Sequence, residues 1–180
     1  MLIDRVRGVG KDVHSNSTAV EATNANTVQR FLQRGVQVGN DSTVNTANNS
    51  FVLWQWLVGD SATTGSTNDS GSIDSTVIAA DADHFSVGTY TGDGGTSATI
   101  KHGLTAAPEM IWVKNRSQGD EWVVGTEYNS YSSPWEYYAH LETTGTFAAA
   151  TNIWNDTEPT NTLFSLGTND NVNGSSANYV

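Results

Sequence analysis

The sequence predicts an all-β protein, an antiparallel β-sandwich of the jelly-roll or concanavalin-like type. Three observations predict this fold class. The apolar stretches are short, turn-forming Gly, Asn, Asp and Ser bound them, and aromatic residues recur along the chain beside β-branched ones. Asn, Asp and Ser side chains bond locally to the backbone and Gly permits positive φ, so the polar remainder predicts many turns between short strands.

The apolar stretches that predict strands are, in chain order, 2–6, 28–38, 51–58, 75–79, 85–90, 98–102, 110–114, 121–128, 137–142 and 163–167. Alternation places Phe85 and Val87 on one face of their strand. In the WQW motif, Trp54 and Trp56 share one face, which predicts that both indoles pack in the core. Only Thr27–Arg34 has a pattern compatible with a short helix.

The composition narrows the classes of partner. The net charge is −11 with eight Lys and Arg, which argues against a nucleic-acid partner. The chain has no cysteine, so disulfide frameworks and thiolate metal sites are excluded. No apolar run approaches membrane-spanning length, and no basic-then-apolar leader opens the sequence, so membrane insertion is not expected.

Two stretches of the chain resemble each other. Sliding the sequence over itself pairs Thr18–Val52 with Thr146–Val180 without a gap, and Gly39 matches Gly167. A second anchor matches MLIDRVR, at the start of the chain, with MIWVKNR at 110–116. The second copy has a longer middle that contains TEYNSYSSPWEYYAH. The sequence therefore predicts two related repeat units.

The repeat divides the chain into three parts. Residues 1–59 are predicted to be the C-terminal part of a first unit that lacks its N-terminal strands, 60–75 a loop or linker, and 76–180 a second unit cut short in its last strand. Two explanations stay open. Either the chain is a window of a longer tandem array, or neighbouring molecules supply the missing strands by strand addition.

Three phrases carry a resemblance to a known family: FSVGTYTGDGG with ATIKHGLTAAPEMIWVKNRS, LIDRVRGVGK with STAVEATNANTVQRF, and VNTANNSFVLWQW. They resemble a tandem-repeat module of tail-fibre-like structural proteins of marine and cyanobacterial bacteriophages. The resemblance covers nearly the whole chain. It implies a β-sandwich in a virion fibre or adhesin, often beside concanavalin-like lectin domains, and it carries over no catalytic residues.

The longer middle of the second copy concentrates aromatic and polar side chains. The candidate glycan-binding residues are Tyr128, Asn129, Tyr131, Trp135, Glu136 and Tyr138. Aromatic rings stack on the C–H faces of sugars, while carboxylates and amides bond the hydroxyl groups. Trp135 follows Pro134 in a predicted turn and is expected to be the most exposed platform. The alternative is an ordinary hairpin whose rings pack on the sheet.

The prediction is that the chain has no metal, no cofactor and no catalytic site. The loops DADH, TGDGG and TNDNVNG offer oxygen ligands for calcium, but none has helix-loop-helix calcium spacing and each also fits a turn. No GxSxG, phosphate-binding loop or zinc pattern occurs. Glu127 with Glu136, or Glu121 with Glu142, could form a glycosidase pair, whose separation the sequence does not show.

The leading hypothesis is a non-enzymatic structural module of a phage fibre or virion-surface protein, in an extracellular setting. Its partners would be other copies of itself, other virion fibre proteins and a host-surface glycan, bound through repeated weak sites that gain avidity together. A first alternative is a subunit of an extracellular filament assembled by strand exchange. A second alternative is a polysaccharide-degrading enzyme, which needs two carboxylates converging in a cleft lined by aromatics such as Trp135.

Overall fold

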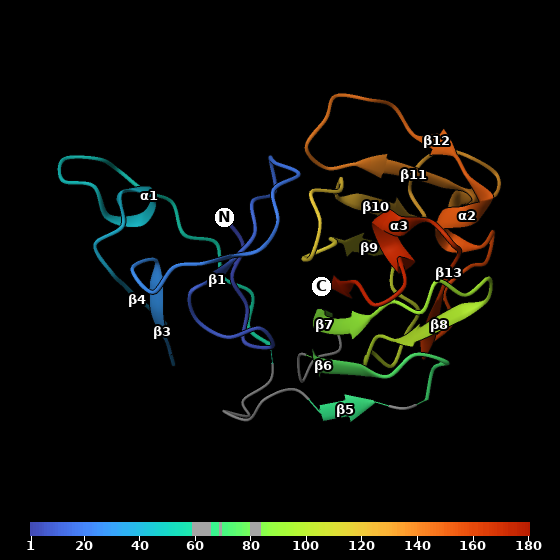
Figure 1. The fold of residues 1–180 in the computed structure, drawn as a ribbon, viewed down its shortest axis with the longest axis horizontal. Coiled ribbons are helices and arrows are strands. Elements are labelled where there is room, and N and C mark those ends of the chain that lie inside the picture. The colour runs from blue at the N-terminus through green and yellow to red at the C-terminus, as the bar shows by residue number, and fades with distance from the viewer. Residues whose placement is uncertain (59–65, 69, 80–83) are drawn as a thin grey trace.

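A computed structural model describes residues 1–58, 66–68, 70–79 and 84–180 (Figure 1). Across these ranges strands prevail over helices, which confirms the all-β prediction. Each helix is a single turn or little more. Within the described ranges, none of them has the length and apolar character that a bilayer-spanning helix requires.

The strands are, in chain order, β1 (Lys11–Asp12), β2 (Ala22–Thr23), β3 (Val28–Leu32), β4 (Gly35–Val38), β5 (Ser66–Asn68), β6 (Ser75–Ala79), β7 (Ser86–Thr91), β8 (Ala98–Lys101), β9 (Met110–Val113), β10 (Val123–Thr126), β11 (Tyr137–His140), β12 (Ala148–Ala149), β13 (Leu163–Leu166) and β14 (Asn178–Tyr179). The helices are α1 (Ser42–Asn45), the 3₁₀ turn η1 (Pro134–Glu136), α2 (Thr151–Trp154) and α3 (Asp170–Asn173).

Two four-stranded sheets meet at the C-terminal strand. One sheet has the order β14-β7-β6-β5 and the other β12-β11-β10-β9. Next to β9, Lys114 donates its backbone N–H to the Val180 carbonyl over 2.8 Å and accepts the Val180 N–H over 3.1 Å. Asn115 and Tyr179 form an isolated antiparallel bridge. β14 therefore lies between β7 and β9 and joins the two sheets (Figure 1).

One core connects these sheets with the β8–β13 pair and the segments around α2 and α3. Its buried members are Ile73, Tyr90, Ala98, Ile100, Ile111, Val113, Val123, Trp135, Ile153, Trp154, Phe164, Leu166, Val172, Ala177 and Tyr179. Trp135 and Trp154 meet edge to face, with ring centroids 5.7 Å apart. Both rings lie on Gly125 of β10, where a Cβ atom would come within 2.7 Å of each indole. Only glycine admits this approach.

Residues 1–58 form a smaller body beside the main sheets (Figure 1). The Glu21 carboxylate joins the two parts. It accepts hydrogen bonds from Arg116 over 2.8 and 2.9 Å and from Arg7 over 3.2 Å. The Trp122 indole N–H adds a bond of 2.8 Å to the His14 carbonyl. Polar contacts to backbone and carboxylate therefore hold the smaller body in place.

Acidification is expected to weaken this attachment. Burial raises the pKa of Glu21, but hydrogen bonds and positive charge from Arg116 and Arg7 outweigh it, so its pKa lies below the usual value. A carboxyl with a lowered folded pKa contributes stability above its unfolded pKa and loses it as pH falls through the folded pKa. We expect Glu21→Gln to reduce the free energy of unfolding at neutral pH and to flatten its fall toward about pH 3, as measured by urea unfolding.

The exposed Glu158 provides the control for this pH experiment. Glu158→Gln should leave the pH dependence of unfolding as it is in the unchanged chain. If the free energy of unfolding fell with pH in the same way for the unchanged chain and for Glu21→Gln, the role assigned to Glu21 would be contradicted.

Two corners of the fold share the same hydrogen bonds. A Cβ on Gly39 would lie 2.4 Å from the Asn26 carbonyl oxygen, and one on Gly167 would lie 2.4 Å from that of Asn152. A short helix follows each glycine, α1 or α3, and its last asparagine donates its side-chain amide to the glycine carbonyl over 2.9 and 3.1 Å respectively. In the structure Asn26 corresponds to Asn152, but the gapless sequence alignment pairs Asn24 with Asn152. The two corners therefore match only when the segment before Gly39 is shifted relative to that alignment.

Four predictions about elements need correction. Residues 2–6 form no strand, and only Leu2 makes an isolated bridge, with Val13. Residues 51–58 form no strand, and Trp54 and Trp56 are exposed rather than buried in the core. The predicted loop or linker 60–75 contains β5, which pairs with β6, while residues 60–65 and 69 lie outside the described residues. Residues 27–34 contain strand β3 and no helix. Residues 51–58 fail as a strand because no neighbouring strand in the described structure pairs with them.

Candidate ligand-binding site

The outer face of β9–β11 carries the candidate site. Side chains along β9 alternate between buried and exposed, and Trp112 points outward with 43% of its surface exposed. Trp112 lies opposite Val124 on β10, and Val124 lies opposite Ala139 on β11. Because every second residue of a strand shares a face, Tyr137 lies on the same face as Trp112.

Two tyrosines stack on this face. The rings of Tyr131 and Tyr137 are nearly parallel, at 7°, with centroids 3.7 Å apart. Tyr131 is 42% exposed, and Tyr128, just before it in the same loop, is 68% exposed. We call Trp112, Tyr131 and Tyr137, together with Tyr128 in the adjoining loop, the aromatic face. It presents flat rings to solvent without enclosing them.

Asn129 positions the loop instead of facing solvent. Its side chain is buried, its amide donates to the Pro134 carbonyl over 2.7 Å, and its carbonyl accepts the Tyr131 N–H over 3.2 Å. Ser130 between them has a left-handed φ of 69°. Asn129 was predicted as a sugar contact. Both polar atoms of its side chain instead form hydrogen bonds within its own loop. It fixes where Tyr131 stands.

Trp135 was predicted to be the most exposed platform, and this prediction is wrong. Its side chain is only 4% exposed. Pro134 starts the η1 turn, which directs the following indole inward onto Gly125 and Trp154. The predicted hairpin alternative, with rings packed on the sheet, holds for this residue. The enzyme alternative required aromatic residues such as Trp135 to line a substrate cleft, and the buried Trp135 ring is not available for that role.

The remaining predicted residues divide between core and surface. Tyr138 is half-buried, packs against the core, and meets His140 edge to face at 5.2 Å. Glu136 is exposed at the end of η1. The structure therefore brings Tyr128, Tyr131 and Glu136 to the surface.

Carboxylates surround Tyr128. A hydrogen bond to Glu127 and partial burial, together with the negative charge of Glu109, raise the pKa of Tyr128 to about 12. The backbone links the same residues, because the Glu127 N–H donates to the Glu109 carbonyl over 3.1 Å. The Tyr128 hydroxyl thus stays protonated at neutral pH and is paired with a strong acceptor, which is a suitable arrangement for sugar hydroxyls.

Sequence reasoning missed Trp112 and left Tyr137 out of the candidate glycan-binding residues. The signal for Trp112 was available in MIWV, where apolar residues run continuously but burial alternates. A continuous apolar run does not indicate which face meets solvent. Tyr137 is half-buried, and the Tyr131 ring lies on it.

The other predicted ligand groups bond within the protein. Glu121 accepts the Asn171 amide over 3.1 Å, and Glu142 accepts the Trp122 N–H over 3.2 Å. The TGDGG and TNDNVNG loops bond each other, and most of DADH lies outside the described residues. Within the described part of the chain, no group of three or more His, Asp or Glu side chains could hold a metal ion.

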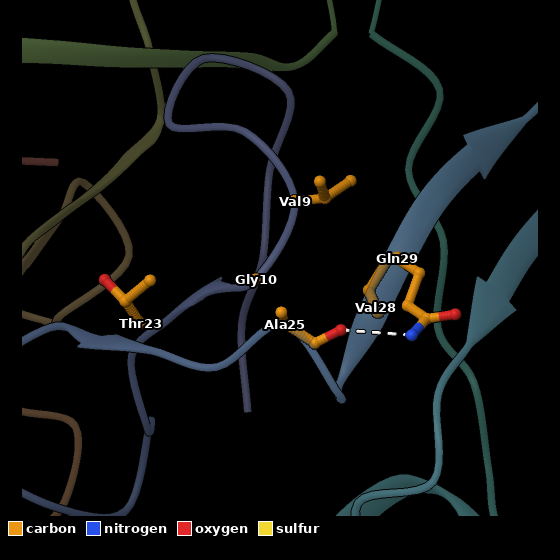
Figure 2. Close-up of a pocket in the computed structure, with 6 residues that line it drawn as sticks. All are labelled: Val9, Gly10, Thr23, Ala25, Val28 and Gln29. Atoms are coloured by element: carbon orange, nitrogen blue, oxygen red, sulfur yellow. Dashed lines mark hydrogen bonds between the residues drawn. The ribbon is translucent and has the colours of Figure 1, made fainter.

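A hollow of about 250 Å³ lies in the smaller body (Figure 2). Its lining residues are Val9, Gly10, Thr23, Ala25, Val28 and Gln29. The Gln29 amide is turned toward the Ala25 carbonyl, to which it donates over 3.2 Å (Figure 2). None of these six side chains carries a charge, and the one amide is already bonded. The aromatic face is therefore the stronger candidate for ligand binding.

Comparison with known proteins gives one match. Neither the curated proteins nor the solved structures include a match to this chain. A family model described as a domain of unknown function, DUF7483, matches residues 1–180. The match spans the printed sequence, so the chain belongs to the DUF7483 family.

Proposed function

We propose that this chain is a non-enzymatic structural module of an extracellular fibre, of the kind bacteriophages display, and that it touches host-surface glycans through the aromatic face. The observation that carries the proposal is the stack of the exposed Tyr131 ring on the half-buried Tyr137, which lies on the same sheet face as Trp112. The phage setting rests on the resemblance in sequence described above.

The chemistry of the aromatic face fits a sugar better than an apolar ligand. Flat rings open to solvent attract the C–H face of a pyranose, and the carboxylates of Glu109 and Glu127 accept bonds from its hydroxyl groups. An open face buries little of any ligand, so each contact is weak. Repetition along a fibre supplies avidity that one face lacks.

We further propose that the chain consists of two related units with a sandwich-like arrangement of sheets. The matched corners at Gly39 and Gly167 support two units, since the glycine approach and the asparagine amide bond occur in both. The shared core, which receives side chains from both sheets and from the β8–β13 pair, supports packed layers.

Removing single rings tests the glycan proposal. We expect Tyr131→Ala and Trp112→Ala each to weaken binding to immobilised lipopolysaccharide or capsular polysaccharide by roughly tenfold, because a stacking contact contributes about 0.5–1.5 kcal/mol beyond its area. Surface plasmon resonance on polysaccharide-coated chips provides the measurement. Both rings are exposed, so the fold should persist, as circular dichroism would verify.

Phe51→Ala is the matched control, because Phe51 is also an exposed aromatic ring but lies in the smaller body. It should bind polysaccharide as well as the unchanged chain. Binding that survives both ring removals, or that falls equally with Phe51→Ala, would contradict the assignment of the aromatic face.

A further inference from the structure

A smaller hollow, of about 160 Å³, lies on the outer face of the strands β6, β7 and β14. On the core side of this sheet, Tyr90 of β7 and Tyr179 of β14 are buried and stack with ring centroids 4.9 Å apart. Because successive side chains of a strand alternate between its two faces, Thr89, Thr91 and Asn178 point to the outer face. All three line the hollow.

Four of the lining residues form a row across the sheet. Asn178 lies opposite Thr91, and on its other side its carbonyl accepts the Arg116 N–H over 2.7 Å. Continuing the register of β6 and β7 by one residue places Asp74 opposite Thr91. Neighbouring strands lie about 4.8 Å apart, so the row extends over roughly 14 Å. It presents a carboxylate, a hydroxyl, an amide and a guanidinium group in that order.

Two further hydroxyl groups lie beside this row. Thr76 of β6 is paired with Thr89 of β7, and both line the hollow. Within the described ranges, neither of these hydroxyl groups forms a hydrogen bond, and the Asp74 carboxylate forms none either. The hollow therefore gathers polar groups that the protein itself does not use, unlike Asn129 and Glu121, which bond within the chain.

The two remaining polar side chains are engaged only in part. Nε and Nη2 of Arg116 donate to the Glu21 carboxylate over 2.8 and 2.9 Å, and among the described residues Nη1 has no acceptor. The Thr91 hydroxyl donates to the Asn178 side-chain oxygen over 3.2 Å, so its own oxygen is still able to accept. The hollow thus offers a donor at one end, an acceptor at the other, and hydroxyl groups between them.

The charges of the lining favour a neutral ligand. Asp74 and Arg116 carry opposite charges at the two ends, and Glu21 already balances the guanidinium group. The net charge of −11 disfavours an anion, while the guanidinium group disfavours a cation. The one aromatic ring of the lining, Tyr90, is buried in the core stack, so a flat apolar ligand finds no stacking partner. Separate donors and acceptors match alcohol groups, because each alcohol both donates and accepts.

We propose that this hollow binds one neutral hexose unit through the hydroxyl groups of the sugar. Asp74 accepts hydrogen bonds from the sugar at one end, and Arg116 donates at the other. The hydroxyl groups of Thr76, Thr89 and Thr91 bond the sugar between them. The volume of about 160 Å³ is comparable with that of a single hexose. Because the hollow is shallow and encloses little of the sugar, binding of a free hexose is weak.

The hollow and the aromatic face share no side chain. By alternation Trp112 and Arg116 lie on the same face of the sheet, but Lys114 lies between them along the strand. Lys114 has no exposed surface, and its ammonium bonds the Thr18 carbonyl of the smaller body. One hexose therefore does not touch both sites. The proposal goes beyond the proposed function, because it adds a second site with its own class of sugar.

Amide chemical shifts of the ¹⁵N-labelled chain measure this binding residue by residue. The probes are D-glucose, D-galactose and D-mannose, each titrated separately, and the uronate of whichever hexose binds. We expect at least one neutral hexose to shift the amide signals of residues 89–91 and 178 in a saturable way. The uronate should bind less tightly, because its carboxylate meets Asp74 in a chain of negative net charge.

Thr89→Val tests the hydrogen bonds without changing the shape of the hollow. Valine favours strands, and the Thr89 hydroxyl has no bond within the described protein to lose, so the fold should persist. We expect Thr89→Val and Asp74→Ala each to weaken hexose binding by roughly fivefold. Thr96→Val is the matched control, since Thr96 is exposed and lies outside the hollow. Arg116 stays unchanged, because its substitution would also free Glu21.

Saturable shifts at the hollow that weaken in Thr89→Val and Asp74→Ala would support the proposal. Absence of such shifts with all three hexoses, equal weakening by Thr96→Val, or tighter binding of the uronate would each overturn it. Tyr131→Ala distinguishes the two sites. Shifts at residues 89–91 should persist in that variant, and their loss would assign the sugar to the aromatic face. Polysaccharide binding that fails while these shifts persist would contradict the proposed function alone.

Discussion

Lys114→Met is expected to lower the free energy of unfolding by about 4 kcal/mol, measured by urea unfolding. Lys114 has no exposed surface. Its ammonium donates to the backbone carbonyls of Thr18 over 3.1 Å, Asn115 over 2.8 Å and Asp120 over 2.8 Å. Methionine has a similar length and no donor, so it would leave these oxygens buried without their partner.

Burial lowers the pKa of Lys114, while the negative charge of Asp120 opposes that shift. The surrounding carbonyl oxygens supply further acceptors for the charged form. Because the Thr18 carbonyl belongs to the smaller body, the lysine also fixes that body against the end of β9. Loss of the ammonium should therefore loosen residues 1–58 as well as the loop 115–120, which hydrogen exchange would detect.

Lys11→Met is the matched control for this prediction. Lys11 makes one exposed bond, of 2.7 Å, to the Thr23 hydroxyl, so the same substitution should cost less than about 1 kcal/mol. Equal losses for Lys114→Met and Lys11→Met would show that the carbonyl cluster contributes little to stability.

Asn173→Ala is expected to cost about 3 kcal/mol. The Asn173 side chain is fully buried, and both its oxygen and its amide group form hydrogen bonds. Its oxygen accepts the Asp93 N–H over 3.0 Å, and its amide donates to the Asp93 carboxylate and to the carbonyls of Gly95 and Gly167, each over 3.1 Å. Alanine removes every one of these bonds and leaves the buried Gly167 carbonyl and the half-buried Gly95 carbonyl without that donor.

The corresponding asparagine in the first corner provides an internal comparison. Asn45 is exposed and donates only to the Gly39 carbonyl over 2.9 Å, so Asn45→Ala should cost less than about 1 kcal/mol. Thermal or urea unfolding of both variants measures the difference. If Asn45→Ala were as damaging as Asn173→Ala, the corner itself and not the added bonds to Asp93 and Gly95 would account for the loss.

Local patterning was sufficient for four of the strands after residue 70. The stretches 75–79, 98–102, 110–114 and 163–167 were predicted as strands, and β6, β8, β9 and β13 begin at the predicted residues. Each combines apolar or β-branched residues with turn residues at both ends, so local preference and tertiary pairing agree. The pairing of β8 with β13 was not predictable, because the two strands lie far apart in the sequence and neither stretch indicates which strand it pairs with.

Long-range pairing explains the failures. The stretch 51–58 has strand composition, but a strand also needs neighbours, and the described structure provides none for it within one chain. Trp135 failed for a different reason. A residue after Pro in a turn is ordinarily exposed, but Gly125 leaves space on the sheet that its indole fills. That space belongs to a residue ten positions earlier, which the local pattern does not reveal.

The candidate site was predictable in its location and only partly in its members. The Tyr-rich segment does supply Tyr128 and Tyr131, both of which are exposed. Asn129 failed as a ligand group because short amide side chains in turns bond their own backbone, as its bonds to Tyr131 and Pro134 show. Trp112 joins the site through strand order, which required knowledge of the β9–β10 register.

The position of β14 has a mechanical consequence. A pull on Val180 along the strand axis is borne simultaneously by the bonds to Lys114 on one side and by the pairing of Tyr179 with Tyr90 on the other. Antiparallel neighbours on both sides load these bonds in shear, so they must break together and cannot open one after another. Tension applied at Val180 is thus shared at once between both sheets, and neither sheet bears it alone.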